Sequence, residues 1–437
     1  YWLYERDMKS SLSFLEKKFK TKPEIIEANT RALKAGFYFG DTIEAIRTTY
    51  KISKADFKKG TYRNVMGNPA IGMGLLAASQ KADTDLFFGG YPITPASDIL
   101  HFLSKYKSLG VKTFQAEDEI AGICSVLGAS FAGKLGITAS SGPGIALKGE
   151  AMGLAIISEL PVVIINIQRG GPSTGLPTKT EQADLMQAMH GRNGEAPAVI
   201  LAPQSPGDCF YMGFEACRIA LEYMMPVILL SDGYLANGSE PWEIPEFSSL
   251  PKINTRKVES PDENFMPYER DEKTLARPWA IAGTKGLEHR IGGLETERKT
   301  GNVSYDPENH EHMIRLRNKK VEAVAETVPD VIPFGDDSGD VLVVGWGSTY
   351  GAIRTAVETL RGEGKSVSHV QLRYINPLPK NLGDVLLKYK KVIVPELNLG
   401  QLNSILRSRY LVDSIGLNKI KGKPFTVEEI YNKISGE

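Results

Sequence analysis

Residues 161–178 read Pro-Val-Val-Ile-Ile-Asn-Ile-Gln-Arg-Gly-Gly-Pro-Ser-Thr-Gly-Leu-Pro-Thr. A short apolar run that opens with proline and ends in a Gly/Pro-rich loop is typical of a strand buried in a parallel sheet. Similar runs lie on both sides of it, with helical stretches between them, at residues 86–89, 113–116, 136–140, 198–202 and 226–231. This alternation predicts an α/β fold, in which helices cover both faces of a doubly wound, mostly parallel sheet.

The chain of 437 residues changes character three times. Residues 1–60 are charged and helical, and because the sequence starts at Tyr1 we interpret them as an N-terminal arm or the end of a preceding domain. The strand–helix alternation fills residues 61–245. Residues 246–335 are polar and predict an irregular connecting segment with one helix near its end, at about 311–326. Alternation returns over 336–437, which predicts a second, smaller α/β domain.

Composition excludes several classes of protein. Lys+Arg and Asp+Glu both number 52, and this balance argues against nucleic acid or an anionic membrane as the main partner. The most apolar stretch, 154–167, is too short for a membrane span of about 18 residues. A sparse, odd cysteine count favours a reduced cytoplasmic protein, and no spacing suits a zinc or iron–sulfur site among Cys124, Cys209 and Cys217. His310 and His312 also form no ligand set, so we expect no metal on this chain.

Parallel sheets bind ligands beyond the carboxyl ends of their strands, which directs attention to the turns that follow them. The first of these turns reads Tyr91-Pro92-Ile93-Thr94-Pro95. Its two prolines make it stiff, so it can hold the Thr94 hydroxyl in a site. The alternative is a helix entry with Thr94 as N-cap and Pro95 at the first helical position.

Two further turns carry candidates. Glu117, Asp118 and Glu119 open a helix, where acids complement the helix dipole. Glu119 also precedes an apolar run, and a carboxylate that is shielded from water is a candidate for a functional residue. The turn at 141–144, Ser-Gly-Pro-Gly, permits close approach of a ligand to the backbone. It matches neither the dinucleotide fingerprint nor the phosphate loop, which argues against a nicotinamide dehydrogenase.

Arg169 stands in the Gly/Pro-rich loop that follows the strand at 161–167. A guanidinium binds a carboxylate in a bidentate fork, so this loop suits a small carboxylate ligand. The alternative is a solvated arginine in a surface turn. His190 opens another glycine loop and is interpreted as structural.

Taken in order, these segments resemble the 2-oxoacid:ferredoxin oxidoreductases. Tyr91–Pro95 is similar to their YPITP signature, 116–121 to their acidic helix entry, and 141–144 to their glycine turn. Residues 168–178 resemble the arginine loop of the alpha subunit, and 395–402 resemble the V-x-E-x-N-x-G-Q-L segment. The similarity runs from about residue 65 to 410, and residues 1–60 resemble the end of a fused gamma domain.

The resemblance implies that 61–245 binds the aminopyrimidine of thiamine diphosphate and that 336–437 is like the C-terminal domain of transketolase. Glu119 would bond the pyrimidine nitrogen and favour the imino tautomer, which deprotonates the thiazolium carbon. The cofactor would also contact Tyr91, Pro92 and Ile93. Thr94 and Arg169 would lie at the substrate carboxylate. A beta subunit would hold the diphosphate, Mg²⁺ and a 4Fe–4S cluster.

The implied activity is oxidative decarboxylation of a 2-oxoacid, with coenzyme A as acyl acceptor and ferredoxin as electron acceptor, in a dimer of heterodimers. A separate alpha-type chain with a gamma-like leader favours 2-oxoglutarate. A pyruvate or branched-chain 2-oxoacid enzyme is the alternative. A second alternative is a non-catalytic assembly subunit, whose signature would be loss of Thr94, Glu119 or Arg169, and all three are present.

Overall fold

The computed structural model describes residues 1–43, 48–260 and 264–436. The chain forms two compact units, Tyr1–Gly60 and Thr61–Glu437. The first unit contains a short helical turn, η1 (Trp2–Tyr4), and two helices, α1 (Lys9–Lys18) and α2 (Pro23–Thr42). Neither helix buries a residue, so the expected helices are present but have no core of their own.

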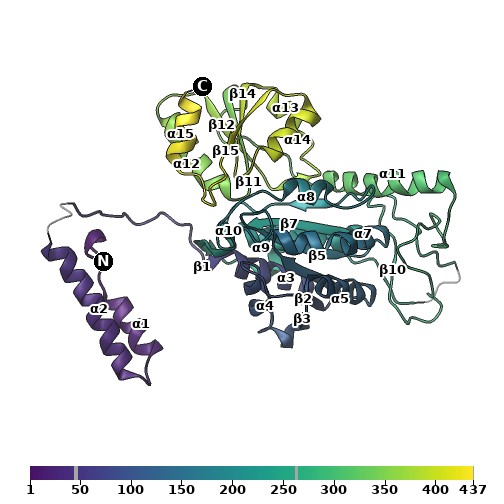
Figure 1. Ribbon diagram of the computed structural model, residues 1–437, viewed down its shortest axis with the longest axis horizontal. Coiled ribbons are helices and arrows are strands. Elements are labelled where there is room, and N and C mark those ends of the chain that lie inside the picture. The colour runs from purple at the N-terminus through teal and green to yellow at the C-terminus, as the bar shows by residue number, and fades with distance from the viewer. Residues whose placement is uncertain (44–47, 261–263, 437) are drawn as a thin grey trace. The chain divides into compact units, whose positions relative to one another are not determined.

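The second unit is built on a seven-stranded sheet with the order β13-β6-β7-β5-β4-β2-β3. Figure 1 labels β7, β5, β2 and β3 of this sheet, with helices on either side of them. All six strands predicted between 86 and 231 are in it and pair in parallel. They are β2 (Leu86–Gly90), β3 (Val111–Gln115), β4 (Leu135–Ser140), β5 (Val162–Gln168), β6 (Val199–Leu201) and β7 (Pro226–Asp232). Every residue of β4, β5 and β7 is buried, which explains their uninterrupted apolar sequences.

Helices cover both faces of this sheet. Val163 and Ile165 of β5 belong to the core on the side of α3 and α9, whereas Val162 and Ile164 belong to the core on the side of α5 and α7. This alternation is the two-residue period of a strand buried on both faces. The helices in this part of the chain are α3 (Gly67–Lys81), α4 (Ser97–Leu103), α5 (Glu119–Phe131), α6 (Gly142–Leu147), α7 (Gly149–Ile157), α8 (Leu185–His190), α9 (Asp208–Tyr223) and α10 (Gly233–Asn237), with the turn η2 (Lys107–Leu109).

Several short strands were not predicted. β1 (Tyr62–Met66) pairs antiparallel with β8 (Ser239–Glu243), and each buries only one residue fully. β13 (Tyr374–Asn376) adds antiparallel to β6 at the edge of the large sheet, although it lies within the sequence segment 336–437. Such short, mixed runs lack the periodicity that identifies a strand.

The C-terminal part of the chain forms a four-stranded parallel sheet with the order β12-β11-β14-β15. Its strands are β11 (Gly339–Trp346), β12 (Val367–Leu372), β14 (Tyr389–Glu396) and β15 (Ser414–Asn418). Its helices are α12 (Tyr350–Gly362), α13 (Leu382–Leu386), α14 (Gln401–Tyr410) and α15 (Val427–Ser435), with the turn η5 (Gly347–Thr349). The second parallel α/β sheet is therefore confirmed, while β15 and α15 were not predicted.

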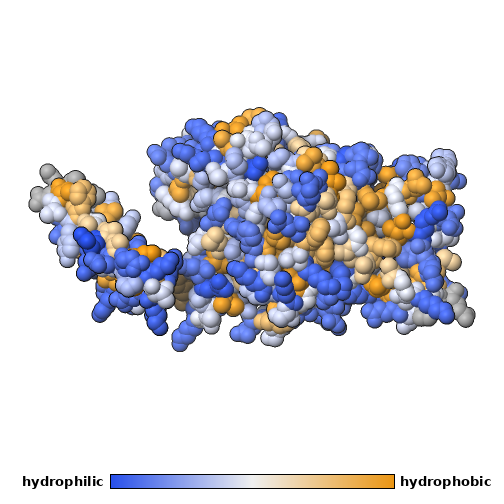
Figure 2. All heavy atoms as spheres, turned by 60° about the horizontal axis from the view of Figure 1, so that its bottom comes forward, coloured by the Kyte–Doolittle hydropathy of each residue, from blue (hydrophilic) through white to orange (hydrophobic). Residues whose placement is uncertain are grey.

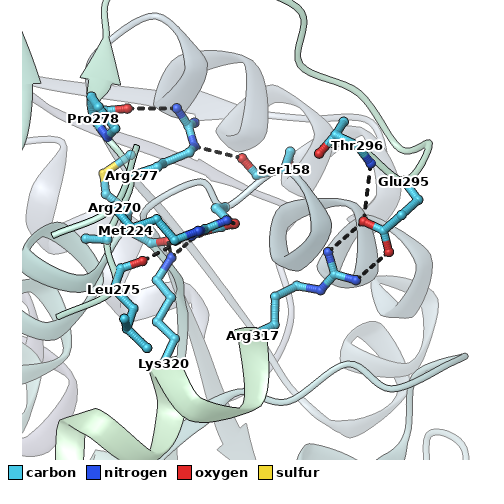
Figure 3. Close-up of polar contacts among 12 residues, drawn as sticks. Ser158, Met224, Arg270, Leu275, Arg277, Pro278, Glu295, Thr296, Arg317 and Lys320 are labelled. Carbon is cyan, nitrogen blue, oxygen red and sulfur yellow. Dashed lines mark hydrogen bonds and ion pairs between the residues drawn. The ribbon is translucent and has the colours of Figure 1, made fainter. Parts of the chain in front are cut away.

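The connecting segment contains η3 (Phe247–Ser249), β9 (Lys257–Val258), β10 (Trp279–Ala280), α11 (Pro307–Ala323) and η4 (Val324–Glu326). A buried ion cluster holds it to the amino-terminal ends of the large sheet's strands. Glu159, which precedes β5, pairs with Arg270 (2.7 and 2.5 Å) and with Lys320. Lys320 of α11 also donates to the Met224 carbonyl at 2.7 Å, ahead of β7 (Figure 3).

Burial raises the pKa of the Glu159 carboxyl, but the charges of Lys320 and Arg270 and their hydrogen bonds outweigh this effect and lower the pKa on balance. The cluster therefore stabilises the fold only while all its partners are present.

In the described parts of the chain, no helix combines the length and the apolar character needed to cross a membrane. Across the same residues, no group of three or more His, Cys, Asp or Glu side chains could hold a metal ion.

Candidate functional site

Buried polar atoms without a partner gather where β4 and β5 end. Ser140 Oγ, Ser141 Oγ, Asn166 Oδ1 and Arg169 Nε are all buried and have no hydrogen-bond partner among the described residues. Buried polar groups are nearly always bonded, so each exception needs an explanation. We call these four residues the strand-end cluster, and it marks the place where a ligand would complete the bonding.

Glu119 lies beside this cluster at the start of α5. Asp118 is the N-cap of the helix, because its Oδ1 accepts a hydrogen bond from the Ala121 N–H at 2.7 Å. Glu119 is therefore not needed as a cap. Its side chain lies against the glycine turn: a Cβ atom built on Gly144 would be 3.0 Å from Glu119 Oε1 and 2.1 Å from Ser140 Oγ. Only glycine permits this approach.

The surroundings of Glu119 differ from the sequence-based expectation. Its side chain is half-buried in this chain, not dry. The apolar run that follows it packs inward at Ile123 and Val126 but leaves Ile120 exposed. This chain alone therefore supplies only part of the enclosure of the carboxylate.

The turn at 91–95 is fixed by a serine. The helix α4 begins at Ser97 with Ala96 as N-cap, so the alternative in which Thr94 caps the helix is wrong. Instead, Ser97 Oγ accepts a hydrogen bond from the Ile93 N–H at 2.9 Å and donates to the Ile93 carbonyl at 3.1 Å. Tyr91 and Pro92 are exposed, and Ile93 is half-buried. Thr94 lines a cleft of about 220 Å³ whose walls also include Pro95, Ser97, Asp98, Thr178, Gly233 and Asn237.

Arg169 joins this turn to the strand-end cluster. Its Nη1 donates to the Thr94 carbonyl at 2.5 Å, so the structure brings the two predicted substrate residues together. The alternative of a solvated surface arginine is wrong, because Arg169 is only 6% exposed. The loop beyond it closes on itself through hydrogen bonds between Gly170 and Lys179 (3.0 Å) and between Leu176 and Gly170 (2.8 Å).

Two charged residues near the cluster were missed in the sequence. Asp184 Oδ2 accepts from Asn166 Nδ2 at 2.9 Å and would lie 3.1 Å from a Cβ built on Gly142. Burial raises the pKa of the Asp184 carboxyl, against the lowering effects of Asn166 and Arg169. Lys148 is fully buried behind Glu119. Lys148 could have been identified from the sequence, because it is a lysine close to the glycine turn and inside an otherwise apolar run.

The segment 395–402 anchors the chain that follows the arginine loop. Gln182 is fully buried and exchanges hydrogen bonds with the Leu397 backbone (3.0 and 3.1 Å), while its Nε2 donates to the Trp346 carbonyl at 2.8 Å. Asn398 Nδ2 donates to the Gln182 carbonyl at 2.8 Å. Glu396 accepts two backbone N–H bonds at the start of α14 and the Trp346 indole N–H. The segment 395–402 therefore connects the two sheets and fixes the chain at Gln182, which follows the arginine loop.

A larger cleft of about 660 Å³ lies between α11 and the loop after α8. Its arginines are already engaged: Arg192 donates to three backbone carbonyls, and Arg315 pairs with Glu311. His190 lines this cleft and is not part of the strand-end cluster. Since these guanidinium groups are bonded within the chain, the strand-end cluster is the better candidate site.

Known proteins are similar to this chain in sequence and in fold. Residues 78–307 match the family described as pyruvate flavodoxin/ferredoxin oxidoreductase, thiamine diphosphate-binding, and residues 339–430 match pyruvate:ferredoxin oxidoreductase core domain II. The chain is 55% identical over 431 residues to 2-oxoglutarate oxidoreductase subunit KorA of Mycobacterium tuberculosis H37Rv, covering 98% of this chain and 65% of that protein. It is 37% identical over 343 residues to 2-oxoglutarate synthase subunit KorA of Archaeoglobus fulgidus, covering 77% of this chain and 88% of that protein.

A solved structure is also similar. It is a 2-oxoglutarate:ferredoxin oxidoreductase from Magnetococcus marinus with 2-oxoglutarate, coenzyme A and succinyl-CoA bound. The match has a TM-score of 0.91 at 34% sequence identity and covers 100% of this chain and 75% of that chain. The chain thus spans only part of the length of that protein and less than two thirds of the Mycobacterium relative.

Proposed function

Since the chain belongs to the thiamine-diphosphate-binding family of pyruvate flavodoxin/ferredoxin oxidoreductases, we propose that it is the alpha-type subunit of a 2-oxoacid:ferredoxin oxidoreductase. The proposed reaction is oxidative decarboxylation, with coenzyme A taking the acyl group and ferredoxin taking the electrons. The favoured substrate is 2-oxoglutarate, in line with the names of both KorA relatives. The observation that carries the proposal is the Glu119 carboxylate, free of any capping role, beside unpartnered polar atoms.

The strand-end cluster fits an aminopyrimidine. Glu119 would bond a ring nitrogen, and Ser140 and Asn166 offer oxygen atoms that lack a partner and can accept from an exocyclic amine. Gly144 leaves the space in which the carboxylate and the ring would meet. Tyr91, Pro92 and Ile93 would line the same site from the turn that follows β2. Thiamine diphosphate itself supplies a carbon nucleophile and an electron sink.

Thr94 and Arg169 would bind the substrate carboxylate. One nitrogen of Arg169 is committed to the Thr94 carbonyl, which fixes the direction of the guanidinium and leaves other N–H groups for a ligand. The Thr94 side chain is exposed in the cleft of about 220 Å³, where its hydroxyl can donate. These residues would orient the oxoacid, and they need not exchange protons with it.

A partner would complete the site over an apolar face of α5. The side of this helix that carries Ile120, Cys124, Gly128 and Phe131 is exposed and uncharged, and Leu147 of α6 is 54% exposed. Figure 2 shows hydrophobic residues gathered around α5 and α7. A contiguous exposed apolar patch indicates an interaction site, and this one begins next to half-buried Glu119. We assign it to a beta subunit that holds the diphosphate, Mg²⁺ and a 4Fe–4S cluster, within a dimer of heterodimers.

The remaining segments have proposed roles as well. Residues 61–245 would be the pyrimidine-binding domain, 246–335 the connecting segment and 336–437 the transketolase C-terminal-like domain. Residues 1–60 would be the end of a gamma-type domain, because their helices expose Phe14, Tyr38 and Phe39 and bury nothing. The free cysteines support a reducing, cytoplasmic location.

Purification from the native host tests the proposal. We expect a beta-type chain to co-purify and the brown complex to reduce a viologen dye with 2-oxoglutarate and coenzyme A, more efficiently than with pyruvate or branched-chain 2-oxoacids. The isolated chain should be colourless and inactive. A brown, active isolated chain would contradict the two-subunit arrangement, and a complex that uses no 2-oxoacid would contradict the activity.

A further inference from the structure

Lys148 is a buried cation whose position calls for an explanation. It lies between α6 and α7 and is 0% exposed. Its Nζ donates to the Glu119 backbone carbonyl at 2.7 Å and to Thr138 Oγ1 at 3.3 Å. Both acceptors are neutral oxygens. A buried charge is costly unless it is paired, and the comparably buried Lys320 forms an ion pair with Glu159.

The two hydrogen bonds make Lys148 a tether. Glu119 is the first residue of α5, and Thr138 lies in β4, so the ammonium group ties the start of the helix to the sheet. The bond to the Glu119 carbonyl fixes the backbone from which the carboxylate projects. An aliphatic side chain could fill the same space but could not make either bond.

Lys148 also supplies charge. The titratable groups that act on it are Glu119 and Asp118 at the start of α5 and Cys124 one turn further along. Asp184 lies on the other side of the glycine turn, against Gly142. Burial lowers the pKa of Lys148 to about 8, although the charges of Glu119, Asp118 and Cys124 raise it. The ammonium form therefore prevails at neutral pH.

The Glu119 carboxylate is half-buried in this chain, and a cofactor and partner above it would remove its remaining water. Charges interact more strongly where water is excluded, so the Lys148 ammonium group would act strongly on a ligand bound there.

We propose that Lys148 is a positioning residue for Glu119, which fixes the first turn of α5 and holds a positive charge beneath a bound aminopyrimidine. This inference rests on the proposed function, because it assigns Lys148 a part in the same site. It accounts for both hydrogen bonds and for a buried cation that, among the described residues, forms no ion pair of the kind seen for Lys320.

The test uses the whole complex loaded with thiamine diphosphate and compares wild type with Lys148→Met, Thr138→Val and Lys320→Met. The main readout is the near-ultraviolet circular dichroism band of the imino tautomer of the bound cofactor, titrated with pH in the absence of substrate. Cofactor affinity and the acid limb of the turnover profile are measured alongside. Lys320→Met is the matched control, since it removes another buried ammonium group away from Glu119.

Lys148→Met should raise the midpoint of the tautomer titration and the acid limb of turnover by about 1 pH unit, as expected when a positive charge near the bound cofactor is lost. Thr138→Val should leave the midpoint in place, because the charge remains, and Lys320→Met should lower stability alone. If Lys148→Met does not fold, Lys148→Gln keeps a donor for the Glu119 carbonyl and should show the same shift.

An unmoved midpoint in a folded, neutral Lys148 variant would overturn the inference, as would an equal shift in Lys320→Met. Either result leaves the proposed function intact, provided that the wild-type complex shows the tautomer band and oxidises a 2-oxoacid. A wild-type complex that binds no thiamine diphosphate would overturn both.

Discussion

A methyl group at Gly144 should disturb the site with little effect on the fold. A Cβ atom there would lie 2.1 Å from Ser140 Oγ, 2.8 Å from Glu119 Cγ and 3.0 Å from Glu119 Oε1. Ordinary contact begins near 3.4 Å, so Glu119 Cγ must move by about 0.6 Å and Ser140 Oγ by about 1.3 Å. The serine hydroxyl can rotate away. The carboxylate has to shift from the position in which it would meet the cofactor.

The expected effects of Gly144→Ala follow from these distances. Overpacking costs about 1–3 kcal/mol, and the gain in helix propensity from glycine to alanine offsets up to about 1 kcal/mol of this, so the free energy of unfolding should fall by about 1 kcal/mol. A displacement approaching 1 Å at a reacting group can cost about 100-fold in rate. We therefore expect the turnover of the complex to fall by about 10- to 100-fold.

The assay is dye-linked oxidation of 2-oxoglutarate by the complex, together with urea unfolding of the isolated chain. Gly351→Ala in α12 is the control, because a Cβ atom at Gly351 would have no atom of the described residues within 4 Å. That variant should keep wild-type turnover and gain about 0.5–1 kcal/mol of stability. Wild-type turnover in a folded Gly144→Ala complex would refute the placement of Glu119 at the cofactor.

Two further changes test other parts of the structure. Arg169→Lys keeps the charge but loses the guanidinium fork, so KM for the oxoacid should rise by about 10- to 100-fold, as expected for loss of a charge-assisted hydrogen bond. A fall in cofactor affinity with unchanged KM would show that Arg169 has been misassigned. Glu159→Gln should lower the free energy of unfolding by about 3–5 kcal/mol, because Arg270 and Lys320 lose their buried partner. The folded pKa of Glu159 is lowered, so its contribution is present above the unfolded value of about 4.3 and is lost as the pH falls below it. Urea unfolding against pH checks both points, and a Glu159→Gln variant as stable as wild type would contradict them.

The large sheet could be predicted because its strands are buried on both faces. Such strands are apolar throughout, as in Val162–Gln168, and glycine, proline or polar residues punctuate them. β1, β8 and β13 could not be predicted, because their pairing depends on distant segments and not on a local pattern. The helix α11 was predicted about four residues too short at its start, because its first turn, capped by Asp306, consists of a proline and three polar residues and shows no apolar period.

The site was predictable only in part. Thr94, Glu119 and Arg169 stood out because they follow strands, and the structure places Arg169 against Thr94. The shorter of the two Lys148 hydrogen bonds reaches a backbone carbonyl 29 residues away in sequence, which no motif reveals. The exposure of Glu119 was also beyond prediction, since it depends on which surfaces cover the helix and not on its sequence.

The central claim is that the Glu119 carboxylate bonds the pyrimidine nitrogen and promotes proton loss from the thiazolium carbon. Glu119→Gln keeps the size of the side chain and removes the charge. Asp118→Asn is the matched control, because it removes a neighbouring charge from the same helix terminus and asparagine caps as well as aspartate. If Glu119 served only the helix dipole, both variants would lose at most about 1 kcal/mol of stability and keep near-normal turnover.

The most direct measurement is hydrogen–deuterium exchange at the thiazolium carbon of thiamine diphosphate bound to the folded complex. Exchange should slow by about 100-fold or more in Glu119→Gln, in line with loss of a positioned proton-transfer group, and stay at the wild-type rate in Asp118→Asn. Wild-type exchange in a cofactor-loaded Glu119→Gln complex would contradict the assignment of Glu119 to the cofactor.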